Sequence, residues 1–448
     1  KKQKIFMKTK FLLVLVLLVS ISINAQTKQW TLQECVNHAI ENNITVKQGE
    51  NSLLINEENI KAAKGAFLPS ASANLGQGLG IGSGFDQVSN QRISNQTTHS
   101  FSYTVNVNQT IFNGFRNKNL RKQSILGLEL SELDLAIIKD DISLNVVNAY
   151  LNILFNKENL IASKKQYDFT NKQLNQVKEL VDAGIQPQAN INDVLATLSN
   201  DLQKVTVAEN NLNLAKLTLS QFLQVQFEGF DIQPINVNVP AEALLYDDIK
   251  PILDYAYNNR SEIKRAEKNI ENAELSTEVS KSGFMPTVSL GYRLGSVWSE
   301  ATQDASKQNF FSEIDGNKGH NFSLNASIPI FSRFQNKTNV AKAKIQEKNS
   351  HLDLERAKLN LEATIQRAFT DAKAAFRTYD AAKTSLEAQQ LSFNNSEERY
   401  NIGAMNAFDL DQGRVRLFNA ETSLINAKYD FVFKTKVLDF YLGKSITQ

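Results

Sequence analysis

The residue types that usually carry catalysis or bind metals are few in this chain and are not grouped. One cysteine and four histidines are spread over the 448 residues, at Cys35, His38, His99, His320 and His351. A single cysteine excludes a disulfide within one chain, and the histidine spacing matches no zinc or haem site. We find no Gly-rich phosphate loop and no Ser/His/Asp arrangement that would indicate nucleophilic catalysis. We therefore expect neither an enzyme nor a protein with a resident metal or cofactor.

The carboxylates of most interest lie where long helical stretches are expected to turn. Gly184 and Gly403 are the expected stops, because glycine just past a helix end is a common termination signal. Asp193 stands nine residues after Gly184, and Asp409 stands six residues after Gly403. An aspartate just inside a helix start often caps free backbone N–H groups and complements the helix dipole. Copies of the same aspartate around a pore would instead attract cations and disfavour bulky anions. Both interpretations stay open for Asp409, whereas a cap is favoured for Asp193.

The elements that would position these carboxylates are very long helices. No proline lies between positions 118 and 182 or after 329, and proline is the main breaker of helix interiors. The stretch 117–183 would form a helix of about 100 Å, and the stretch 336–400 one nearly as long. Apolar residues in the second stretch step by four and three, which predicts a coiled-coil seam. The seam residues are Leu361, Ile365, Ala368, Ala372, Ala375, Tyr379, Ala382 and Leu386, and the first stretch matches their start with Ile142, Val146, Ala149 and Ile153.

Four segments alternate polar and apolar residues, which is the pattern of a strand with two different faces. They form two predicted β-hairpins, 67–112 and 284–331, whose connections from Ser83 to Thr98 and from Ser299 to Gly319 read as polar loops. Such alternation over about ten residues is typical of a transmembrane barrel strand with a lipid-facing side. The apolar face is expected to carry Ala71, Ala73, Leu75, Leu79 and Ile81; Phe101, Tyr103, Val105 and Val107; Val288, Leu290, Tyr292 and Leu294; and Phe322, Leu324, Ala326, Ile328 and Ile330.

The strands and helices occur twice. Pro69 and Pro286 open the two hairpins 217 residues apart, and Phe112 and Phe331 close them 219 residues apart. A repeated pattern of this kind indicates a duplicated unit. We predict a first repeat over 26–222, a linker over 223–251 with a short strand at 235–239, and a second repeat over 252–448. Each repeat would start with a shorter helix, 31–64 or 252–282, that leads into its first strand.

The N-terminus has the composition of a secretory signal peptide. Basic residues precede an apolar run over 11–23 that is too short to span a membrane comfortably. We expect residues 1–25 to be removed, with cleavage after Ala25 and Met7 as the start of translation. The 49 basic and 47 acidic residues nearly balance, so the charge gives no argument for nucleic acid.

Four strands cannot close a barrel, and an open sheet edge cannot lie in a bilayer. Several copies must therefore combine, with two giving eight strands and three giving twelve. Helices of this length must project from the membrane. The fold class is thus an α+β membrane protein with four barrel strands per chain, an oligomeric barrel and a long α-helical coiled coil.

The whole mature sequence resembles the TolC-type outer-membrane efflux family. The most specific stretch runs from Arg399 through Gly403 to Leu410 and continues over 417–420 and 426–429. The resemblance implies a homotrimer with a twelve-stranded barrel in the outer-membrane lipid and a tunnel in the periplasm. It also implies a passive exit duct for small molecules that works with a periplasmic adaptor and an inner-membrane transporter. A duct for secreted polypeptides and a trimeric coiled-coil surface protein are the alternatives.

The same resemblance assigns a gate to the tip of the second helical pair. Tyr400 matches a gate tyrosine and Asp409 matches a ring aspartate of the family. The next ring aspartate falls on Gln412, with Asp411 beside it, and a gate arginine falls on Met405. Asp193 resembles the partner aspartate of the first pair, and the tips at Gly184 and Gly403 are expected to contact the adaptor. With Met405 and Gln412 uncharged, any closing force must come from elsewhere.

Overall fold

The computed structural model describes residues 29–86, 91–235, 248–301 and 309–444. The predicted signal peptide lies outside these residues. By its internal contacts the chain divides into two compact units, one of Lys1–Gln48, Leu135–Arg260 and Lys358–Gln448, the other of Gly49–Asp134 and Ser261–Ala357. Among the described residues, no helix combines the length and the apolar character needed to cross a membrane.

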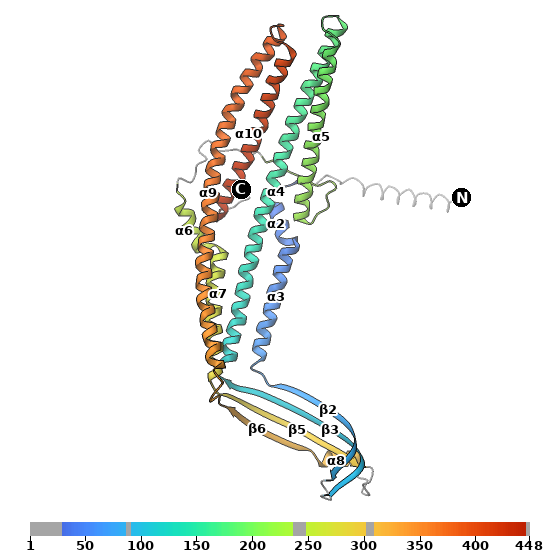
Figure 1. The fold of residues 1–448 in the computed structure, drawn as a ribbon, viewed down its shortest axis with the longest axis vertical. Helices are drawn as coiled ribbons and strands as arrows, with labels where there is room; N and C mark the ends of the chain where they lie inside the picture. The colour runs from blue at the N-terminus through green and yellow to red at the C-terminus, as the bar shows by residue number, and fades with distance from the viewer. Residues whose placement is uncertain (1–28, 87–90, 236–247, 302–308, 445–448) are drawn as a thin grey trace, which may run out of the picture. The chain divides into compact units, whose positions relative to one another are not determined.

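The second unit holds a four-stranded antiparallel sheet (Figure 1). Its strands are β2 (Ser70–Asp86), β3 (Gln91–Asn113), β5 (Thr287–Ala301) and β6 (Gly319–Ser327), in the order β2-β3-β5-β6. The strand register keeps like residues together across the sheet. Val105 pairs with Ala73 and Leu294, and its neighbour Asn106 pairs with Ser72 and Arg293. One face is therefore apolar and the other polar over all four strands, as the alternation predicts.

The apolar face is exposed, which is unusual for side chains of this kind. Leu75 is 75% exposed, Phe322 is 75% exposed and Leu324 is 71% exposed. The polar face carries Ser, Asn, Thr and Gly residues. A sheet of this composition is suited to lipid on one side and water on the other.

The strands extend further than predicted at one hairpin and stop earlier at the other. Most of the first predicted loop is strand, because β2 continues to Asp86 and β3 begins at Gln91. In the second predicted loop, β5 continues to Ala301 and a short helix, α8 (Phe310–Gly316), follows. β6 ends at Ser327, so Ile328 and Ile330 lie beyond the strand. Pro329 between them has no N–H group to donate to a neighbouring strand.

The long helices match the prediction closely. α4 (Arg116–Asp182) and α9 (Gln335–Asn401) each contain 67 residues, and α5 (Ala189–Leu223) and α10 (Ala407–Tyr441) each contain 35. The predicted seam is buried or half-buried throughout. The apolar core of the first unit includes Ile142, Val146, Ala149, Ile153, Leu361, Ile365, Ala372, Ala375 and Ala382.

The two shorter helices are each broken by one residue, which the sequence analysis did not predict. The first is α2 (Leu32–Asn42) followed by α3 (Ile44–Gly65), and the second is α6 (Lys250–Asn259) followed by α7 (Ser261–Lys281). Asn43 and Arg260 stand at the breaks, both in extended conformation. The Asn43 amide donates to the Phe222 carbonyl oxygen at 3.2 Å and accepts from the Thr45 N–H at 2.9 Å. Its side chain thus caps α3 while anchoring the break.

Arg260 is anchored in an equivalent way. Its guanidinium pairs with the Asp140 carboxylate at 3.1 Å and lies 4.1 Å from the centre of the Phe440 ring. Both partners belong to the same compact unit as Arg260. A single buried polar side chain therefore replaces one helical residue in each repeat.

Two very short strands join the linker to the start of the described chain. β1 (Gln29–Trp30) pairs in parallel with β4 (Asp231–Ile232), so the observed strand precedes the predicted one at 235–239, most of which lies outside the described residues. Lys157 and Lys216 approach the Asp231 carboxylate to 2.7 and 3.2 Å. Burial raises the pKa of Asp231, but hydrogen bonds from Lys157, the Ile232 N–H and Lys216 outweigh it and keep the pKa below its ordinary value.

Candidate functional site

The helical tips at Gly184 and Gly403 have the same backbone geometry. Both glycines adopt left-handed conformation, with φ of 74° and 75°. At the first tip the Ile185 N–H donates to the Leu180 carbonyl at 2.9 Å, and the Gly184 N–H donates to the Val181 carbonyl at 2.9 Å. The second tip repeats both bonds, Ala404 to Arg399 at 2.7 Å and Gly403 to Tyr400 at 2.9 Å. This is the Schellman motif, which satisfies the last carbonyls of a helix and needs a residue at positive φ.

Replacing Gly403 with alanine should destabilise the second tip by about 1 kcal/mol, because a Cβ disfavours the left-handed conformation. A Cβ built on Gly403 meets nothing within 4 Å, so the cost comes from the backbone and not from a clash. Thermal unfolding of the purified protein measures it. Gly65→Ala is the matched control, because Gly65 also has open space around it but ends α3 without a positive φ. Equal effects of the two substitutions would contradict the assignment.

The predicted gate residues of the second tip lie at the end of α9 and the start of α10. One of them, Asp409, is not the capping residue of α10. Tyr400 is half-buried in the last turn of α9. Asp409 is exposed in the first turn of α10, and its N–H donates to the Asn406 side chain at 2.8 Å. Asn406 is therefore the cap of α10, and the Asp409 carboxylate is free to face solvent near the positive end of the helix dipole. Gln412 is exposed one turn further on.

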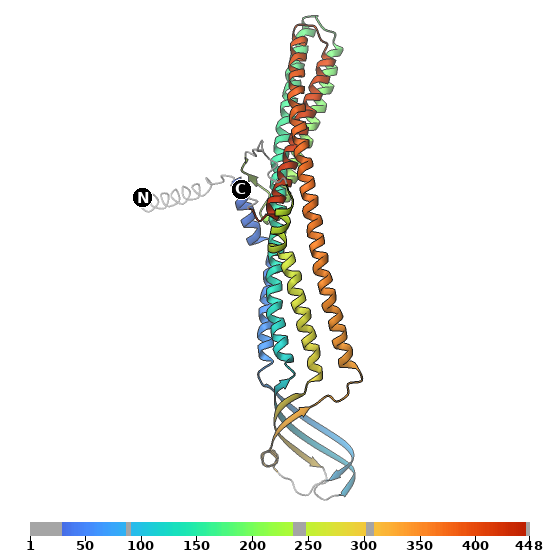
Figure 2. The same cartoon turned by 90° about the vertical axis from the view of Figure 1, so that its left-hand side faces the viewer.

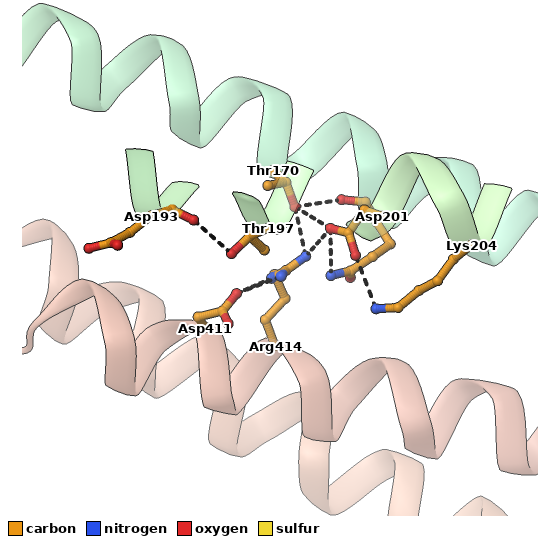
Figure 3. Close-up of polar contacts among 8 residues, drawn as sticks. Thr170, Asp193, Thr197, Asp201, Lys204, Asp411 and Arg414 are labelled. Carbon is orange, nitrogen blue, oxygen red and sulfur yellow. Dashed lines mark hydrogen bonds and ion pairs between the residues drawn. The ribbon is translucent and has the colours of Figure 1, made fainter. Parts of the chain in front are cut away.

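Asp193 is not a helix cap, so that interpretation is wrong. α5 begins at Ala189 after Gln188, and Gln188 makes no side-chain capping bond. Asp193 is already inside the helix, where its carbonyl oxygen accepts from the Thr197 hydroxyl at 3.1 Å (Figure 3). The sequence misplaces the helix start because α5 has no conventional capping residue.

Asp411 has a partner that the sequence analysis did not identify. Its carboxylate accepts from Arg414 through Nη2 at 2.5 Å and through Nε at 3.1 Å. The other end of the same guanidinium contacts the first helical pair, which consists of α4 and α5, whereas Arg414 belongs to the second pair, α9 and α10. Arg414 Nη1 donates to Asp201 Oδ2 on α5 at 2.9 Å and to Thr170 Oγ1 on α4 at 2.7 Å (Figure 3). Three helices from the two pairs thus meet at one arginine.

This group, which we call the Arg414 cluster, consists of Thr170, Asp201, Asp411 and Arg414. Thr170 is 0% exposed, Asp201 is 1% exposed and Arg414 is 3% exposed. The Thr170 hydroxyl also donates to Asp201 Oδ2 at 2.6 Å. Arginine suits such a site because its planar fork can bind a carboxylate on each side while staying charged.

Two further side chains complete the surroundings of the Arg414 cluster. Lys204 Nζ donates to Asp201 Oδ1 at 3.1 Å, and the Gln166 amide lies against both Asp201 and the guanidinium. Within the part of the chain that the structure describes, no buried polar side-chain atom lacks a hydrogen-bond partner. A fully satisfied cluster of this kind is costly to break from one side, because the remaining charge stays buried.

A second polar contact joins the same two helical pairs. The Tyr429 hydroxyl on α10 donates to Glu158 Oε1 on α4 at 2.7 Å, and Lys428 Nζ reaches the same oxygen at 3.2 Å. Burial raises the pKa of the Tyr429 phenol, and the hydrogen bond to Glu158 raises it further. The phenol therefore stays protonated and remains a donor at any physiological pH.

The sequence does contain a signal for the Arg414 cluster. On α5 the seam runs Val194, Leu198, Asp201, Val205, Ala208, Leu212, Ala215 and Leu219, again in steps of four and three. Asp201 is the one charged residue in this apolar series, and a charge at a seam position needs a buried partner. Thr170 and Arg414 lie 31 and 213 residues away along the chain, so the sequence alone does not identify them as that partner.

No metal site accompanies these residues. Over the described ranges, no three or more His, Cys, Asp or Glu side chains are grouped so that they could hold a metal ion.

Comparison with known proteins places this architecture in a family. Residues 35–223 and 252–444 match the family described as outer membrane efflux protein. The chain belongs to the outer membrane efflux protein family, so the predicted fold class, outer-membrane location and role as an efflux channel are confirmed. The chain is 21% identical to outer membrane protein TolC of Salmonella enteritidis over 391 residues, which cover 86% of this chain and 76% of that protein.

Other relatives and solved structures agree. The chain is 23% identical to the cation efflux system protein CusC of Escherichia coli over 374 residues, covering 79% of this chain and 74% of CusC. It shares its fold with the CmeC outer membrane channel of Campylobacter jejuni, with a TM-score of 0.74 at 18% identity over 92% of this chain and 85% of that one. The outer membrane protein VceC of Vibrio cholerae also shares the fold, with a TM-score of 0.74 at 14% identity over 93% of this chain and 96% of that one. These relatives are channel proteins rather than enzymes.

Proposed function

We propose that three copies of this chain form a passive exit duct for small molecules, in complex with a periplasmic adaptor and an inner-membrane transporter. The observation that carries the proposal is the four-stranded sheet with an exposed apolar face. Its outer strands β2 and β6 pair with a neighbour on one side only within the described sheet. Unpaired strand edges are not tolerated in lipid, so other copies must supply the missing neighbours. In this scheme residues 26–222 and 252–448 are two copies of one duplicated unit.

The helical tips are the proposed gate of this duct. Tyr400, Asp409 and Gln412 would line the constriction from the second tip and Asp193 would approach from the first. The Schellman turns at Gly184 and Gly403 would contact the adaptor. Because Met405 and Gln412 carry no charge, the closing force is assigned to the Arg414 cluster, which holds the two helical pairs of one protomer together. Asp411 acts in it by binding the guanidinium from the second pair.

Replacing Asp409 with asparagine should lower the cation selectivity of the reconstituted pore, because it removes one negative charge per copy at an exposed position near the tip. The reversal potential under a salt gradient measures this selectivity. Asp409→Glu is the control, since it keeps the charge and should keep the selectivity. If Asp409→Asn and the wild type have the same reversal potential, Asp409 does not belong to the gate.

The exit-duct function itself is tested in cells. We expect heat-modifiable, detergent-resistant oligomers in the outer membrane and an efflux defect for small molecules when the gene is deleted. If the deletion abolishes secretion of a polypeptide but leaves small-molecule efflux normal, the chain forms a duct for secreted polypeptides instead. A soluble rod with no efflux phenotype would favour the coiled-coil surface protein and overturn the proposal.

A further inference from the structure

The short helix α8 packs on the apolar face of the sheet. The Ser296 hydroxyl of β5 donates to the Ile314 carbonyl of α8 at 2.7 Å, and the Asn317 amide donates to the Val297 carbonyl at 2.9 Å. Ser296 is only 3% exposed because α8 covers it. Ser296 shares its face with Leu294, two residues earlier in the strand. The helix is therefore seated on the apolar side, and the polar side of the sheet stays clear of it.

An aromatic cluster connects α8 to the strands. The Phe310 ring lies 5.5 Å from the ring of Phe101 on β3 and 5.1 Å from that of Trp298 on β5, both edge-on. Phe101 and Trp298 are register partners, so they point to the same face. The ring centre of the next residue, Phe311, lies 5.3 Å from that of Phe310, but the Phe311 side chain is 78% exposed. One phenylalanine thus fixes the helix to the sheet and the other points away from it.

The place of α8 along the strands is equally specific. β3 runs from Gln91 to Asn113 and is followed by α4, while β5 starts at Thr287 after α7 and ends at Ala301. β3 and β5 are antiparallel, so α8, which follows β5, lies at the end of the sheet opposite to the end at which β3 leads into α4 (Figures 1 and 2). Asp315 follows Phe311 by one turn on the same side of the helix and pairs with Lys318 just beyond its end. The aromatic residues thus lie in the first turn of α8 and the ion pair at its end. On β3 the next residues of the same face beyond Phe101 are His99 and Thr97, so α8 lies where the apolar series of this strand ends.

We propose that α8 is a membrane-interface helix, with Phe311 inserted among the lipids of the outer leaflet and Asp315 and Lys318 in the headgroup region. Barrels carry aromatic girdles at both membrane interfaces, and amphipathic helices with exposed aromatic residues lie in that zone. Lipid is the occupant that the structure favours, because α8 continues the same exposed apolar face that carries Leu75 and Phe322. The inference rests on that face being the lipid-facing one, and the experiment tests the two points separately.

The test uses nitroxide spin labels on the full assembled protein in vesicles of phosphatidylethanolamine and phosphatidylglycerol. Labels are attached at Phe311→Cys, Val105→Cys and Asp315→Cys, each with Cys35→Ala, and their collision rates with oxygen and with a water-soluble nickel complex are compared. Oxygen concentrates in lipid and the nickel complex stays in water. We expect the oxygen-to-nickel ratio at 311 to be severalfold higher than at 315 and to approach that at 105.

Three results would overturn the proposal. If the labels at 311 and 315 both report water while 105 reports lipid, α8 lies in water and only this inference fails. Protection of 311 from both reagents would show that another protein surface, such as a second copy, covers it. A label at 105 that reports water would remove the lipid-facing assignment and, with it, the barrel.

Discussion

Replacing Asp201 with alanine is expected to weaken the contact between the two helical pairs by about 1–3 kcal/mol, because a buried donor that loses its acceptor costs this much. Arg414, whose side chain is 4% exposed, keeps Asp411 on its own helix but loses its carboxylate partner on the first helical pair. Hydrogen exchange of the α5 and α10 amides near the Arg414 cluster, measured on the purified assembly, reports the change.

The same two helices of the first pair offer a matched control. Glu209 on α5 pairs with Lys164 on α4 at 2.9 Å, but both side chains are about half exposed. An exposed ion pair contributes only about 0–1 kcal/mol, so Glu209→Ala should change little. The double variant Asp201→Ala with Arg414→Leu should recover part of the loss, because the charges that then lose their partners, Asp411 and Lys204, are partly exposed. Equal effects of Asp201→Ala and Glu209→Ala would contradict the role of the Arg414 cluster.

Replacing Val105 with arginine is expected to destabilise the assembled barrel by about 2–4 kcal/mol per copy if the site lies at the bilayer midplane. Val105 is in the middle of β3 on the apolar face, between its register partners Ala73 and Leu294. A guanidinium there would have to enter the hydrocarbon region or distort the bilayer. The yield of folded, heat-modifiable oligomers in outer-membrane fractions measures the effect.

The neighbouring residue provides the control for the face assignment. Thr104 points to the polar face, opposite Asn74 and Gly295. Thr104→Arg adds the same charge to the same strand but on the side expected to face water, so assembly should be retained. Normal yield from Val105→Arg, or equal loss from both variants, would show that the two faces are wrongly assigned.

The strands and the long helices could be predicted because each has a strong local signal. The period-two alternation fixes which residues share a face, and the sheet register keeps Val105 and Leu294 on the same side, as predicted. The absence of proline predicted both 67-residue helices to within about one residue. These patterns are set by the chain's own covalent geometry, so they do not depend on distant contacts.

The features that escaped prediction all depend on contacts between distant residues. The helix breaks at Asn43 and Arg260 carry no proline or glycine, and each is held by a partner far along the chain, the Phe222 carbonyl and Asp140. α8 depends on packing against β5. A sequence pattern does not identify such distant partners, so the sequence predicts a continuous helix at each break and a loop where α8 forms.

The candidate site was predicted in part. The turns at Gly184 and Gly403 were predicted from their glycines, and the structure gives both a positive φ. The family resemblance gives Asp411 no role beyond its place beside Gln412, yet Asp411 binds the arginine that joins the two helical pairs. Asp201 is not among the predicted site residues. Its importance follows from its place as the one charged residue in the apolar seam of α5, and this seam is not part of the sequence prediction.

In the proposed membrane pore, the Arg414 cluster holds the helical end closed. Single-channel recording in planar bilayers tests this closure, with the wild type, Asp201→Ala and Glu209→Ala compared under the same salt and voltage. We predict a small conductance for the wild type and for Glu209→Ala, and a severalfold larger one for Asp201→Ala. Identical conductances of all three proteins, or no conductance at all, would contradict the claim.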